Sequence, residues 1–168
     1  STRLGEHILI TPSSIPYDEL EPDDICLMNY LGQKISSSTK QSNQKIITPS
    51  SEWRIHADIL SARKEINSVL HCHSISATAL SCHSKEIPSF HYMTAVAGGN
   101  NIRCAKYATF GTCELSKNAV KALDGRLACL LANHGQVVLA NNLKKALHIA
   151  IEVETLSKMY LQACQIGE

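Results

Sequence analysis

The sequence lacks any apolar run close to the length of about 20 residues that a membrane-spanning helix needs. It also lacks clusters of lysine or arginine, and its 16 basic residues are balanced by 15 acidic ones. A chain without a strong electric field has little attraction for nucleic acid or anionic membranes. We therefore expect a soluble protein that has no nucleic acid or membrane partner, and any substrate is expected to be small.

The sequence also has no Cys-x-x-Cys spacing, the pattern typical of redox motifs and of many structural metal sites. Its seven cysteines are an odd number, and most lie in apolar stretches such as residues 25–27 and 127–131. Buried, reduced thiols are typical of proteins in a reducing compartment. We therefore expect a cytoplasmic protein without a disulfide framework.

Apolar residues make up 44% of the 168 residues and follow no internal repeat. This length and composition predict a single domain spanning residues 1–168. The chain opens at Ser1 on what looks like the end of one hairpin strand, which predicts that an N-terminal part of the domain lies outside the sequence.

Apolar periodicity and turn residues divide the chain into strands and helices. The predicted strands are residues 7–11, 25–30, 68–74, 87–90, 127–132 and 136–139. The predicted helices are residues 53–63, 75–80, 114–123 and about 142–163, with a brief helix that ends at Gly98 and Gly99. Residues 36–44 are polar and low in complexity, so a surface loop is expected there.

His71 and His73 lie near the end of a predicted strand, and alternation along the strand places both side chains on one face, with Cys72 on the other. This pair can bind a metal ion, or it can be two ordinary histidines at a strand end. His134 follows a second apolar run and precedes Gly135, which permits close approach of the backbone. Three imidazoles with a carboxylate or water form a standard catalytic zinc set.

Glu52 lies at the predicted start of the first helix, where it can complement the helix dipole. Alternatively, Ser50, Ser51 and the N–H groups of the helix start bind a phosphate, with Glu52 beside that anion and able to move protons. His56 shares a helix face with Glu52 and is interpreted as either a ligand or a buried partner that orients the site.

Two further segments allow both a structural and a functional interpretation. The loop that contains Ser13 and Ser14 is either a solvated turn or a place where hydroxyl groups bind an anion. Tyr92 is either a proton donor or an ordinary half-buried phenol, and periodicity does not separate these alternatives.

Six segments occur in an order and spacing that are typical of one known family. They are residues 49–56, 69–73, 88–93, 97–100, 107–111 and 133–135. On these segments the chain resembles the class II aldolase/adducin family, most closely its L-fuculose-phosphate aldolases, from about Ile8 to the end of the last helix. The resemblance implies an α/β fold with three α/β/α layers around a central, largely antiparallel sheet. It also implies a ring-like homotetramer with sites between neighbouring subunits.

The family's site residues transfer to specific positions of this sequence. The resemblance implies one Zn²⁺ per subunit bound by His71, His73 and His134. It gives Glu52 the role of catalytic acid/base and of a zinc ligand when substrate is absent, and gives Tyr92 the role of proton donor to the aldehyde oxygen, across a subunit interface. The implied phosphate-binding residues are Ser50, Ser51, Ser13 and Ser14. The last pair departs from the family's Thr-Gly turn.

The implied function is zinc-dependent cleavage of a phosphorylated sugar, a ketose 1-phosphate similar to fuculose 1-phosphate, into dihydroxyacetone phosphate and an aldehyde through a metal-stabilised enediolate. Alternatives within the family are a methylthioribulose-1-phosphate dehydratase, a sugar-acid phosphate decarboxylase and a pentulose-phosphate 4-epimerase. The epimerases usually carry aspartate at the position of Glu52. An adducin-like interaction domain is a further alternative, but such domains lack the zinc histidines.

The resemblance also predicts two features beyond the 168 residues. A Gly-Asn turn that holds the phosphate is expected just before Ser1, and a tail with another catalytic tyrosine is expected after Glu168.

Overall fold

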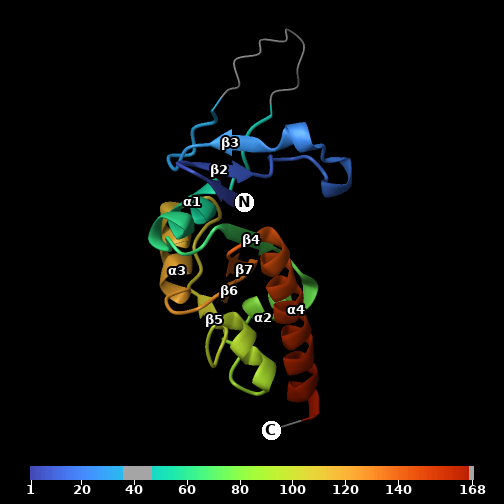
Figure 1. Cartoon of the computed structure of the whole chain (residues 1–168). Coiled ribbons are helices and arrows are strands. Elements are labelled where there is room, and N and C mark those ends of the chain that lie inside the picture. Colours follow the sequence, from blue (N-terminus) through green and yellow to red (C-terminus); the bar gives the residue numbers. More distant parts are fainter. Residues whose placement is uncertain (36–46, 167–168) are drawn as a thin grey trace.

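One sheet runs through the part of the chain that the computed structural model describes, residues 1–35 and 47–166 (Figure 1). Its seven strands in these residues have the order β3-β2-β1-β4-β7-β6-β5. The bounds are β1 Thr2–Leu4, β2 His7–Ile10, β3 Cys26–Met28, β4 Ser68–Cys72, β5 Arg103–Ala105, β6 Ala128–Leu131 and β7 Gly135–Ala140. All neighbouring strands are antiparallel except β5 and β6, so the prediction of a largely antiparallel sheet is confirmed.

Helices cover both faces of this sheet and produce the three layers. Helices α1 (Trp53–Ala62) and α3 (Cys113–Ala122) pack against each other on one face. Helices α2 (Ile75–Ser81) and α4 (Leu143–Ile166) pack together on the other face, with the 3₁₀ helix η3 (Tyr92–Ala97) beside α4. Two short 3₁₀ helices, η1 (Tyr17–Glu19) and η2 (Pro22–Asp24), connect β2 to β3.

Because side chains alternate along the central strands, they pack into two separate hydrophobic cores, one on each face of the sheet. In β7, Val137 and Leu139 belong to the core under α1 and α3, whereas Val138 and Ala140 belong to the core under α2 and α4. Every residue of β6 and β7 is buried, which explains why these strands read as continuous apolar runs rather than as alternating ones.

The ends of the predicted elements agree with local capping chemistry in several places. The side-chain oxygen of Asn142 accepts the backbone N–H of Lys145 at 2.8 Å, which confirms the asparagine cap predicted for α4. Gly98 has a φ of 83° and ends η3, so the glycine signal was correct, although this brief helix is 3₁₀ rather than α.

One predicted strand is wrong, and one observed strand was not predicted. Residues 87–90 do not form a strand, because Ile87 makes only one isolated bridge, to Ile102. Strand β5 was not predicted from the sequence; it is three residues long, and its parallel pairing with β6 is a contact that no local pattern reveals. The loop expected at residues 36–44 lies outside the described residues.

Helix length and apolarity also bear on the membrane question. Among the described residues, no helix combines the length and the apolar character needed to cross a bilayer.

Candidate active site

Strand β4 ends at Cys72, earlier than the predicted strand, but His71 within it and His73 directly after it point to the same side, as the sequence predicted. Their Nε2 atoms lie 3.1 Å apart, and their rings meet edge to face. The thiol of Cys72 belongs to the opposite side, where Glu154 of α4 is near, and burial raises its pKa. The alternation of a strand therefore separates the two imidazoles from the intervening cysteine.

His134 enters the same space from the tight turn between β6 and β7. Asn133 has a φ of 55°, a left-handed conformation that this turn requires. A Cβ atom on Gly135 would lie 2.5 Å from the carbonyl oxygen of Cys72 and 2.9 Å from Cδ2 of His73. Glycine is therefore needed here for close approach of the two strand ends, as predicted.

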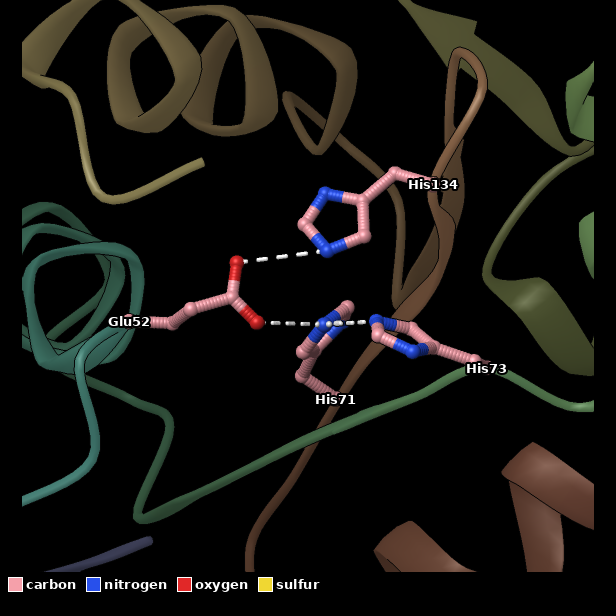
Figure 2. Close-up of side chains that lie close together, drawn as sticks. All are labelled: Glu52, His71, His73 and His134. Carbon is pink, nitrogen blue, oxygen red and sulfur yellow. Dashed lines mark hydrogen bonds and ion pairs between the residues drawn. The ribbon is translucent and has the colours of Figure 1, made fainter. Parts of the chain in front are cut away.

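Glu52 reaches the three histidines from the start of α1 (Figure 2). Its Oε2 lies 2.9 Å from Nε2 of His71, and its Oε1 lies 3.3 Å from Nε2 of His134. The carboxylate makes no side-chain capping bond with the helix; its contacts are with His71 and His134. Helix α1 aims this carboxylate at the histidines.

The electrostatics of Glu52 reflect two opposed effects. Burial raises the pKa of the carboxyl group, but the contacts with His134 and His71 lower it more in sum, so the net pKa lies well below its usual range. For His73, burial and the neighbouring histidines His71 and His134 lower the pKa. A neutral imidazole beside an ionised carboxylate is the protonation state that a metal ligand requires.

The four side chains fit a transition-metal ion. One ligand atom from each of Glu52, His71, His73 and His134 lies within 4.8 Å of all the others. Oε1 of Glu52 is buried, and apart from the 3.3 Å approach of His134 Nε2 it has no hydrogen-bond partner, as expected of an atom that faces a cation. Nδ1 of His71 lies 2.9 Å from the carbonyl oxygen of Gln136, to which its N–H donates; this bond leaves Nε2 free for the metal.

His56 is not a member of this group. It is 7% exposed, and its Nδ1 lies 2.8 Å from Oγ of Ser1 rather than facing the cluster. Burial is the main cause that holds its pKa well below the usual range. Of the two interpretations of His56, only that of a buried residue remains.

The two serine pairs lie in loops that are neighbours in the fold. Pro12 and Pro49 form an isolated bridge, the N–H of Ser13 donates to the carbonyl of Thr48, and the N–H of Ser50 donates to the carbonyl of Thr11. Ser50 Oγ also accepts the N–H of Glu52 at 3.2 Å. The structure therefore brings Ser13 and Ser50 close to the start of α1.

Ser14 has a φ of 64°, so this serine adopts a left-handed conformation that is more typical of glycine. The left-handed turn expected from the resemblance at Ser13 and Ser14 therefore forms here without a glycine.

Tyr92 lies apart from the four clustered side chains within this chain. It is 82% exposed at the start of η3 and lines a separate hollow of about 320 Å³ with Ser89, His91 and Asn100. The alternative of a half-buried phenol is wrong, since the ring is largely exposed.

Two larger hollows meet at Glu52 and His73. One, of about 410 Å³, is lined by Tyr107 and Phe110 on the side of His134. The other, of about 840 Å³, extends past Ser50 to α4. The sequence reading missed Tyr107 and Phe110 as residues of the site and treated their segment as a turn, although it is one of the six family segments.

Comparison with known proteins places this site in a family. The family model described as "Class II Aldolase and Adducin N-terminal domain" matches residues 1–161. The chain therefore belongs to the class II aldolase/adducin family; it has the class II aldolase fold and is a lyase of this type. Enzymes of this class depend on a metal, in agreement with the glutamate and three histidines described above.

Particular relatives are similar along the whole chain. A 5-methylthioribulose-1-phosphate/5-deoxyribulose-1-phosphate aldolase of Rhodospirillum rubrum is 45% identical over 168 residues, which cover 100% of this chain and 72% of the relative. An L-fuculose phosphate aldolase of Escherichia coli is 43% identical, with 100% and 74% covered. A solved L-fuculose 1-phosphate aldolase superimposes with a TM-score of 0.88 at 41% identity and covers 97% of this chain and 73% of its own.

Proposed function

We propose that this protein is a zinc-dependent aldolase that cleaves a ketose 1-phosphate into dihydroxyacetone phosphate and an aldehyde. The observation that carries this proposal is the convergence of Glu52, His71, His73 and His134 on one point. Three imidazoles and a carboxylate favour zinc over calcium or magnesium, which prefer sites made of oxygen ligands. The aldolases among the similar proteins support the reaction type.

Each protein group has a definite task in this reaction. When bound, the zinc ion supplies a Lewis acid that polarises the ketone and stabilises negative charge. Glu52 delivers a proton to the carbon released when the carbon–carbon bond breaks, and accepts it again in the reverse direction. Ser50, Ser51, Ser13 and Ser14 bind the phosphate through hydroxyl and N–H groups.

The assembly proposed with this function is a homotetramer with sites between subunits. Tyr92 is the proposed donor to the aldehyde oxygen, and its place in a hollow that none of the four clustered residues lines is consistent with a role in the site of a neighbouring subunit. The exposed phenol of Tyr92 supports this arrangement because an interface residue is exposed in an isolated chain.

The substrate is tested by direct comparison of candidate sugars. Zinc-loaded protein is incubated separately with L-fuculose 1-phosphate, L-rhamnulose 1-phosphate, 5-deoxyribulose 1-phosphate and 5-methylthioribulose 1-phosphate. Release of dihydroxyacetone phosphate from at least one of them is expected. Its absence with all four would contradict the aldolase proposal, and loss of water from methylthioribulose 1-phosphate would favour a dehydratase.

A further inference from the structure

Helix α2 begins directly after the segment of His73, and its last residue, Ser81, is hydrogen-bonded to the turn that carries His134. Ser81 is fully buried. Its Oγ accepts the backbone N–H of His134 at 3.2 Å, an N–H that also donates to the carbonyl of Leu131 at 3.0 Å, and its carbonyl oxygen accepts the N–H of Asn133 at 3.0 Å. The same Oγ donates to the carbonyl of Thr78 at 2.8 Å, so the hydroxyl is itself fixed by the helix.

Gln136 holds the other end of the helix. Its side chain is fully buried, and its Nε2 donates to Oγ of Ser74 at 2.7 Å and to the carbonyl of Ala150 in α4 at 3.2 Å. Ser74 immediately follows His73 and precedes α2. The backbone carbonyl of Gln136 is also the partner of His71 Nδ1. Gln136 thus bonds directly to His71 and, through Ser74, to the residue that follows His73.

We propose that α2 is a clamp that sets the spacing of His73 and His134, with Ser81 and Gln136 as its positioning residues. The inference rests on the proposed metal-binding function. A metal site tolerates deviations of only about 0.2 Å in its ligand distances. The turn at Asn133 has a left-handed conformation, and the N–H groups of Asn133 and His134 both donate to Ser81, so this residue attaches the turn to the end of α2.

The first test removes the hydroxyl group from Ser81 and compares it with a matched serine. Ser157 is also fully buried, and its Oγ donates to the carbonyl of Val153 at 2.7 Å within α4. Zn²⁺ affinity is measured by competition with a chromophoric chelator. Ser81→Ala is expected to bind Zn²⁺ about tenfold more weakly than wild type, in the range found for residues that orient ligands. Ser157→Ala is expected to bind as wild type does.

The second test separates positioning from stability at Gln136. Gln136→Met keeps a similar volume and also removes the buried Oε1, which has no hydrogen-bond partner in the structure. The thermal unfolding temperature of the metal-free variant is expected to fall, because the bonds to Ser74 and Ala150 are lost, and its Zn²⁺ affinity is expected to fall as well, so the metal spectrum is the measurement that separates the two effects. The visible spectrum of the Co²⁺-loaded variant is expected to shift, and excess metal is expected to restore cleavage.

The outcomes distinguish the clamp from the proposed function. If Ser81→Ala and Gln136→Met bind Zn²⁺ as tightly as Ser157→Ala and give the wild-type Co²⁺ spectrum, the clamp is overturned while the proposed function stands. A wild-type chain that binds no divalent transition metal overturns both.

Discussion

At the scale of single residues, Glu52 lies at the start of a helix, but its carboxylate faces the candidate active site and does not cap the helix. Its backbone precedes α1, while its carboxylate contacts His71 and His134 and lies at the junction of two hollows. Burial would favour the neutral acid, but the histidine contacts favour the ionised form. The carboxyl group is therefore ionised at neutral pH, which is the form that the proposed role of Glu52 as a base requires.

This assignment predicts the effect of Glu52→Gln. The amide has a similar size and can still contact the histidines, but it cannot take up or deliver a proton. Cleavage is expected to fall by at least about 100-fold, the lower range for loss of a general acid/base. Bound zinc, measured by metal analysis, is expected to remain because three imidazoles are unchanged.

The exposed Glu114 provides a control for Glu52, since Glu114→Gln makes the same chemical change outside the site. Glu114→Gln is expected to keep wild-type activity. Unchanged cleavage by Glu52→Gln with zinc retained would remove Glu52 from its proposed role.

At the scale of elements, α2 is capped by a residue of another helix. Ser74 makes no side-chain capping bond; instead the Glu154 carboxylate of α4 accepts the N–H groups of Ser76 and Ala77 at 2.8 and 2.9 Å. Burial raises the pKa of Glu154, but hydrogen bonds from Ala77, Ser74 and Ser76 lower it more in sum. An ionised carboxylate is favourable at the positive end of a helix.

The lowered pKa of Glu154 makes its contribution to stability dependent on pH. A group whose pKa is lower in the folded state stabilises the fold above its unfolded pKa, here 4.5, and this stabilisation is lost as the pH falls through the folded value. Glu154→Gln is therefore expected to reduce the free energy of unfolding by about 1 kcal/mol at pH 7. The difference from wild type should shrink below pH 4.5.

Urea unfolding at pH 7 and at pH 3.5 would measure this difference. Glu152→Gln, two residues earlier in α4, is the matched control and is expected to show no such pH-dependent loss. An equal effect of Glu154→Gln at both pH values would contradict a contribution from the ionised carboxylate.

At the scale of the whole molecule, the four clustered side chains and Tyr92 occupy separate places in one chain. The cluster lies where β4, α1 and the β6–β7 turn meet, whereas Tyr92 begins η3 and lines its own hollow. If both take part in one reaction, the active site is completed by a neighbouring subunit. A ring of identical subunits provides such a contact at every interface.

Mixed assemblies test this arrangement. Tyr92→Phe and Glu52→Gln are each expected to have little activity alone. When the two variants are unfolded and refolded together, about a quarter of the sites should pair an intact Glu52 with an intact Tyr92 from a neighbour. Cleavage should rise accordingly. If Tyr92 acted within its own subunit, no mixed site would be intact and activity would not return.

Much of the architecture follows from local sequence patterns. Asn142 marks the start of α4, Gly98 marks the end of η3, and apolar runs mark β6 and β7, because capping, turns and strand burial depend on neighbouring residues. The spacing of His71 and His73 also placed both imidazoles on one face. In contrast, β5 escaped prediction and residues 87–90 were mistaken for a strand, because strand pairing depends on a distant partner.

The sequence by itself therefore determined the family, the main helices and strands, and the residue types that form the candidate site, since these follow from short segments. The family resemblance implied that Glu52 and His134 join His71 and His73, but only the tertiary structure showed these four side chains together, His56 outside this group and Tyr92 in a hollow of its own. The physical reason is that these relations depend on how segments about 20 to 80 residues apart pack across the sheet, and no local pattern carries that information.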